Sequence, residues 1–110
     1  MSKFNKNQRS GWLLAAVILL SVLLVEVANA ADVFNGRKVY ETHCQSCHGE
    51  DGTSMMPGTP DFTGGELIVR PDTALLGQIR EGTDFMPAYR GILSDSEILD
   101  VIAYIRSLQR

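Results

Sequence analysis

Residues 44–48 read CQSCH, and this stretch decides how the rest of the 110-residue chain is interpreted. It places two thiols three residues apart, with an imidazole directly after the second thiol. A CxxC pair alone is also compatible with a redox dithiol, half of a zinc site or an ordinary disulfide. Zinc needs four ligands, and the only other histidine of the chain, His43, flanks the same short turn. A thioredoxin-like dithiol expects a βαβ context, which the sequence lacks.

The complete motif, with its histidine, is the arrangement associated with attachment of a c-type haem. The two thiols can add to the two vinyl groups of one haem. The adjacent imidazole reaches the iron from the same side, because the backbone turns immediately after the second thioether. We therefore predict one covalent haem c, with thioethers to Cys44 and Cys47 and with His48 as the proximal iron ligand.

An iron held by His48 has a second axial position, and the ligand there sets the redox behaviour. His43 is tethered on the attachment side and cannot readily reach across the ring. The methionines at 55–56 follow the motif closely, in a stretch that we expect to round the haem edge. Met86 lies far downstream, between two predicted helices, on a loop stiffened by a proline. We predict Met86 as the distal ligand; the alternative is that it only fills the core as a flexible apolar side chain.

The first thirty residues are typical of a secretory signal peptide. A basic head at 1–9 precedes an uncharged, mostly apolar run at 11–25, and the small residues of Ala28-Asn29-Ala30 form a cleavage site. We predict a signal peptide over 1–30 and one domain over 31–110. The alternative is an uncleaved anchor, although the run is shorter than the ~20 apolar residues that span a bilayer. Either way the domain is exported: we predict a periplasmic protein, or one anchored to the inner membrane and facing the periplasm.

The charge of the predicted domain restricts its partners. Residues 31–110 contain seven Lys or Arg and twelve Asp or Glu, a net charge of −5 before a cofactor is counted. Nucleic acid is disfavoured, because phosphate binding needs clustered basic residues. A redox protein with a basic docking surface is favoured. Contact with a membrane is expected only if the N-terminal segment stays attached.

The apolar pattern predicts a few helices, and no strand pattern of comparable quality appears after residue 31. We expect a helix over 32–42, a glycine- and proline-rich connection over 43–65, and a helix over 74–80 that is capped by Asp72 or Thr73 and stopped by Gly82. A capping box of Ser94 and Glu97 then starts the clearest helix of the chain.

This order of elements resembles the class I, single-haem cytochrome c family. The resemblance rests on CQSCHG at 44–49, FMPAY at 85–89 and DVIAYIRSL at 100–108, and it covers 32–109. It is strongest to short bacterial domains related to the cytochrome subunits of oxidases and dehydrogenases. It implies a small all-α fold whose N- and C-terminal helices cross, with the haem in a cleft and one haem edge exposed.

The resemblance also implies roles for individual residues. Gly36 would let the two helices approach where Tyr104 packs, with Tyr40 nearby, although all three are equally compatible with plain core positions. A backbone carbonyl in the loop after the motif would orient the ligating imidazole; Pro60 is the first candidate and Pro57 the second, and the sequence does not decide between them.

We predict a one-electron carrier that shuttles electrons between exported or membrane-bound redox partners, such as a dehydrogenase or an oxidase. A thioether ligand and an apolar pocket favour ferrous iron, so a positive reduction potential is expected. No residue set suggests an enzyme, because no spare histidine is placed for acid–base work. The alternatives are a gas sensor or peroxidase-like site with an open iron position, and a dedicated subunit of one enzyme.

Overall fold

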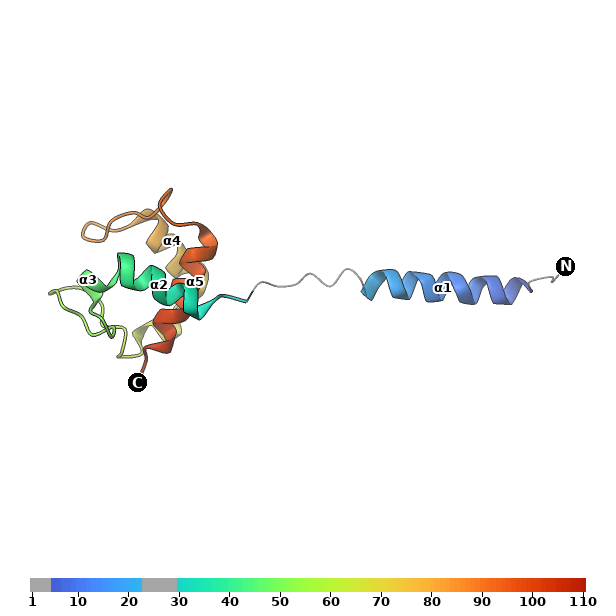
Figure 1. Cartoon of the computed structure of the whole chain (residues 1–110), viewed down its shortest axis with the longest axis horizontal. Coiled ribbons are helices and arrows are strands. Elements are labelled where there is room, and N and C mark those ends of the chain that lie inside the picture. Colours follow the sequence, from blue (N-terminus) through green and yellow to red (C-terminus); the bar gives the residue numbers. More distant parts are fainter. Residues whose placement is uncertain (1–4, 23–29) are drawn as a thin grey trace.

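The structure, a computed structural model, describes residues 5–22 and 30–110. Within those ranges it contains no β-strand, only an isolated bridge between Arg90 and Leu93. The predicted all-α class is therefore confirmed. The helices, shown in Figure 1, are α1 (Lys6–Val22), α2 (Val33–His43), α3 (Gln45–His48), the 3-10 helix η1 (Glu66–Val69), α4 (Asp72–Glu81) and α5 (Asp95–Ser107).

Local capping explains where α2 and α5 begin. The Asp32 carboxylate accepts hydrogen bonds from the N–H groups of Phe34 and Asn35, at 2.9 and 3.1 Å. Ser94 and Glu97 form the predicted capping box, in which each side chain accepts from the other residue's N–H. Both caps satisfy N–H groups that have no partner inside the helix, so the two helix starts follow from the neighbouring sequence.

The predicted cap of α4 is wrong, because Asp72 already lies inside the helix and Pro71 occupies the capping position. The Asp72 carboxylate instead accepts a hydrogen bond from the guanidinium of Arg106 at 2.6 Å. That partner lies on α5, far along the chain, and local sequence gives no sign of it. The predicted end of α4 is confirmed: Gly82 terminates the helix with a φ of 72°.

Helices α2 and α5 cross in contact at the centre of the domain (Figure 1). Gly36 of α2 lies against the α5 backbone, where a Cβ would come within 2.0 Å of the Asp100 carbonyl oxygen. Farther along the pair, the rings of Tyr40 and Tyr104 pack with centroids 5.2 Å apart. The expected crossing is present, but Gly36 meets the backbone of Asp100 and Val101, and the tyrosine pair forms a separate contact.

A buried carboxylate joins the start of α2 to α5. Asp100 accepts hydrogen bonds from the backbone N–H of Asp32 at 2.7 Å and from the Asn35 side-chain amide at 2.8 Å. Buried charges are costly unless they are hydrogen-bonded, and both oxygens of Asp100 have a partner. The first residues of the domain are thereby attached directly to its last helix.

The apolar core lies between α2, α4 and α5, and the connections contribute to it as well. The four most deeply buried side chains come from α2 and α5: Tyr40, Ile98, Val101 and Ile102. The long connection after α3 adds Phe62 and Leu67, and the loop before α5 adds Tyr89 and Leu93. Because core side chains anchor both loops, the loops are held where the candidate site needs them.

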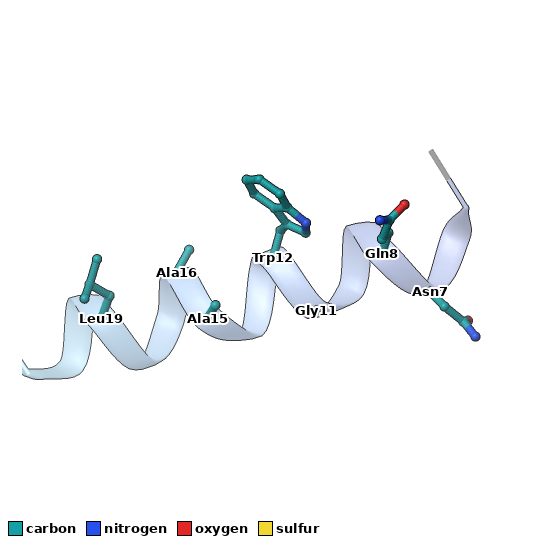
Figure 2. A pocket seen from close by; sticks show the side chains of 7 residues that line it. All are labelled: Asn7, Gln8, Gly11, Trp12, Ala15, Ala16 and Leu19. Atoms are coloured by element: carbon teal, nitrogen blue, oxygen red, sulfur yellow. The ribbon is translucent and has the colours of Figure 1, made fainter. Parts of the chain in front are cut away.

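Helix α1 lies apart from the other helices in Figure 1, and its apolar side chains are exposed. Figure 2 shows the side chains that line a pocket along α1, which come from residues between Asn7 and Leu19. Within the described ranges, no helix is both long enough and apolar enough to cross a membrane. Two residues of the predicted cleavage site, 28–29, fall outside the described residues, so cleavage stays a prediction.

Candidate functional site

The CQSCH motif forms one compact turn between α2 and the long connection. Helix α2 ends at His43, Cys44 follows, and α3 carries the remainder of the motif. Both thiols are free, with Cys44 half-buried and Cys47 exposed. Burial, together with a smaller effect of the neighbouring Cys47, raises the pKa of Cys44 to about 11. A redox dithiol depends on a lowered thiol pKa, so the environment of Cys44 argues against that alternative.

The imidazole of His48 has a defined orientation. Its Nδ1 lies 3.4 Å from the carbonyl oxygen of Pro60, so Pro60 and not Pro57 is the orienting residue. The ring stacks on buried Phe62, with centroids 4.3 Å apart and planes 16° apart. Burial lowers the pKa of His48, while the Pro60 carbonyl acts in the opposite direction. A neutral ring that donates from Nδ1 keeps a free lone pair on Nε2, the atom that can bind iron.

The turn after His48 is held by backbone contacts. The buried Tyr40 hydroxyl donates to the Gly49 carbonyl at 2.7 Å. Gly49 has a φ of 82°, and a Cβ there would approach the Thr53 carbonyl oxygen to 2.0 Å. The N–H of Met55 donates to the Cys47 carbonyl at 3.3 Å. The connection therefore folds back on the motif at once, and Met55 lies beside the attachment turn.

Met86 lies on the loop between α4 and α5, half-buried against the core. Its N–H donates to the Thr83 side-chain oxygen at 3.0 Å, and its carbonyl accepts from the Thr83 N–H at 2.8 Å. Gly82 lies directly under this turn, where a Cβ would come within 2.6 Å of the Met86 carbonyl oxygen. The backbone of Met86 is thus constrained on two sides before any ligand is considered.

Tyr89 joins the Met86 loop to the attachment motif. Its hydroxyl donates to the carbonyl of His43 at 2.8 Å. Its ring packs edge-on against the His43 ring, with the two centroids 5.8 Å apart. His43 directly precedes Cys44, so the fold brings the predicted distal segment and the predicted attachment segment together. Figure 1 shows α3 and the loop after α4 on the same side of the domain, away from α1.

Three residues of this site were not among the predicted site residues. Phe62 follows Pro60 closely, Tyr89 belongs to FMPAY, and Tyr40 was expected only as a packing residue. Their roles depend on contacts with distant residues. The sequence showed only that an aromatic residue lies near each predicted site residue.

The arranged groups suit a covalently attached haem: two free thiols, an imidazole with an available Nε2 and a thioether sulfur. Among the described residues, no group of three or more His, Cys, Asp or Glu side chains is placed to hold a metal ion by itself. Cys44, Cys47, His48 and Met86 could hold the haem and its iron.

Comparison with known proteins agrees with this site. Residues 31–105 match the family described as cytochrome C oxidase, cbb3-type, subunit III. Cytochrome c6 of Thermosynechococcus vestitus is 34% identical over 93 residues, 83% of this chain and 83% of that protein. The solved structure of the c-type cytochrome KustC0563 is similar with a TM-score of 0.62 and 28% identity, covering 68% of this chain and 98% of that one. Cytochrome c6 from the diatom Phaeodactylum tricornutum gives a TM-score of 0.58 and 28% identity, covering 70% and 93%.

The family match extends from the start of the predicted domain into α5, so it includes the attachment motif and the Met86 loop. The relatives are c-type cytochromes, and their likeness extends over most of their own length. The chain therefore belongs to the cytochrome c family, carries one covalently attached haem c, and transfers electrons between redox proteins as a carrier and not as an enzyme.

Proposed function

We propose that His48 and Met86 are the two axial ligands of a haem iron attached through Cys44 and Cys47, and that the domain works outside the cytoplasm. The observation that supports this most is the Tyr89–His43 hydrogen bond, which joins the Met86 loop to the attachment turn. The bound haem supplies the one-electron couple. The protein's own residues hold the two ligand groups ready on separate segments.

The two ligand segments are prepared in different ways. The Pro60 carbonyl accepts from Nδ1 of His48 and so favours the tautomer that leaves Nε2 available, while the Phe62 ring stacks on the imidazole and holds its plane. Met86 is held by its two hydrogen bonds with Thr83. Ligands fixed in advance move little when the iron changes its oxidation state, and a carrier benefits because little reorganisation accompanies each transfer.

The axial pair predicts an optical signature and a redox signature. The oxidised haem-loaded protein should show the weak band near ~695 nm that accompanies methionine bound to ferric haem, and its midpoint potential should be positive. Met86→Ala should abolish the band. It should also lower the reduction potential, because the methionine thioether favours ferrous over ferric iron and this preference is lost. The measurement is an optical spectrum of both oxidation states together with a potentiometric titration.

Met56→Ala is the matched control, since Met56 is half exposed beside the attachment motif. This variant should keep both the band and the potential of the wild type. A wild-type spectrum of high-spin ferric haem, or ready binding of carbon monoxide by the ferrous protein at neutral pH, would contradict ligation by Met86. Those results would favour the open, ligand-binding alternative.

We also propose that residues 1–30 direct export and are removed after Ala30, which makes the domain periplasmic. The exposed apolar side chains of α1 have no place in the domain core, and this supports a segment with a separate purpose. The intact mass of the haem-loaded protein, purified from the periplasm of a bacterial host, should equal residues 31–110 plus one haem. A mass that retains 1–30, in the membrane fraction, would show instead an anchored protein.

The acidic domain suggests the chemistry of its partners. With a net charge of −5, residues 31–110 suit a redox protein whose docking surface is basic, and we propose a dehydrogenase or an oxidase of this kind.

A further inference from the structure

We infer that Tyr89 is a positioning residue for Met86: its hydroxyl holds the ligand loop against the segment that attaches the haem. The inference rests on the proposed ligation by Met86. It assigns to Tyr89 a role in keeping the distal position closed, in addition to the packing role of its ring.

The backbone of Tyr89 is already fixed on the α4 side of the site. Its N–H donates to the carbonyl of Ile79 in α4 at 3.1 Å, and its own carbonyl accepts from the N–H groups of Ile92 and Leu93, both at 3.0 Å. These bonds attach the loop to α4 and to the approach to α5. None of them reaches α2 or the haem-attachment motif.

The hydroxyl supplies the connection to α2. It donates to the His43 carbonyl at 2.8 Å from a side chain that is 9% exposed. His43 is the last residue of α2, where helix carbonyls lack partners inside the helix, so this bond satisfies an acceptor that would otherwise need water. Because His43 immediately precedes Cys44, the bond is one residue from the first thioether.

The distance along the chain to Met86 is equally short. Only Pro87 and Ala88 separate Met86 from Tyr89, and proline restricts the backbone of that link. The Met86 turn is therefore closed by Thr83, and the segment after it is held to α4 by the backbone of Tyr89 and to α2 by the Tyr89 hydroxyl. When the hydroxyl bond is lost, the backbone bonds to α4 remain but the loop is held less firmly against α2, and we expect Met86 to leave the iron more often.

The test replaces only the hydroxyl. Tyr89→Phe keeps the ring in the core and removes the hydrogen bond to His43. Imidazole added to the ferric haem-loaded protein must displace Met86, so its apparent affinity reports how often that ligand is off. We expect Tyr89→Phe to bind imidazole about five- to tenfold more tightly than the wild type, consistent with the loss of one hydrogen bond, and to show a weaker ~695 nm band.

Tyr104→Phe is the matched control, because it removes a hydroxyl from the α2–α5 contact, where the Tyr104 ring packs on Tyr40. It should bind imidazole with wild-type affinity. All titrations are made well below the thermal transition of each variant, so that a general loss of stability does not enter the comparison. Tyr89→Leu, which also removes the ring, should bind imidazole at least as tightly as Tyr89→Phe.

The outcomes separate this inference from the proposed function. If the wild type lacks the ~695 nm band, ligation by Met86 fails, and the inference fails with it. If the wild type has the band and Tyr89→Phe binds imidazole with the affinity of Tyr104→Phe, ligation by Met86 stands and the positioning role of Tyr89 is wrong.

Discussion

Replacing Gly36 by alanine is expected to lower the free energy of unfolding by about 3 kcal/mol, the upper part of the usual range for overpacking a core. The new Cβ would lie 2.0 Å from the Asp100 carbonyl oxygen and 2.5 Å from its carbonyl carbon. Both atoms belong to the backbone of α5, so the contact is relieved only by moving the two helices apart. That movement would also stretch the hydrogen bonds of the Asp100 carboxylate to Asp32 and Asn35. For a small domain with about 5–15 kcal/mol of stability, the loss is large.

Urea denaturation of the haem-loaded protein, followed by far-UV circular dichroism, measures this effect. Gly77→Ala is the control, because Gly77 also lies within a helix but a Cβ added there would have no heavy atom within 4 Å. It should leave stability unchanged or raise it by up to about 1 kcal/mol, since alanine favours helix. Equal stabilities for the two variants would mean that α2 and α5 do not cross at Gly36.

Gly82→Ala is expected to displace Met86 and to remove most of the ~695 nm band of the oxidised protein. Gly82 has a φ of 72° and a ψ of −172°, a conformation open essentially to glycine alone, which costs other residues about 1–3 kcal/mol. A Cβ there would also come within 2.6 Å of the Met86 carbonyl oxygen and 2.7 Å of the Ala88 nitrogen. Because the clash is with the backbone of the Met86 loop itself, the loop must move away from α4.

Gly91→Ala is the control that distinguishes backbone strain from steric clash with the Met86 loop. Gly91 has a φ of 78°, but a Cβ there would meet nothing within 4 Å. This variant should lose stability through backbone strain and still keep the ~695 nm band. The comparison is made by optical spectroscopy and thermal unfolding of both variants. If Gly82→Ala keeps the full band, the close packing of the loop on Gly82 does not hold Met86 in place.

Features encoded within a few neighbouring residues could be predicted from the sequence. The attachment motif is contiguous, so Cys44, Cys47 and His48 must share one turn in any fold. Two helix boundaries were correct for the same reason: the Ser94 cap and the Gly82 stop each act within one helical turn.

Features that depend on a distant partner were predicted incompletely or wrongly. Asp72 has a side chain suited to capping a helix, but its carboxylate accepts a hydrogen bond from Arg106 of α5 instead. Helix α4 already begins at Asp72, before the predicted start at residue 74. The sequence placed Pro60 before Pro57 as the orienting residue but did not decide between them, since both lie in the same glycine-rich connection. Only the path of that connection brings the Pro60 carbonyl to His48.

By itself the sequence determined that this is an all-α chain with a haem-attachment turn, and it predicted an export signal and a downstream methionine ligand, because motif, composition and helical periodicity are properties of short segments. The tertiary structure alone decided how Met86 is held, since Thr83, Gly82 and the Tyr89–His43 bond act together only after α2, α4 and α5 have packed. The physical reason is that a hydrogen bond between residues far apart in the chain forms only after the core has brought its two ends within reach, and no local pattern encodes that meeting.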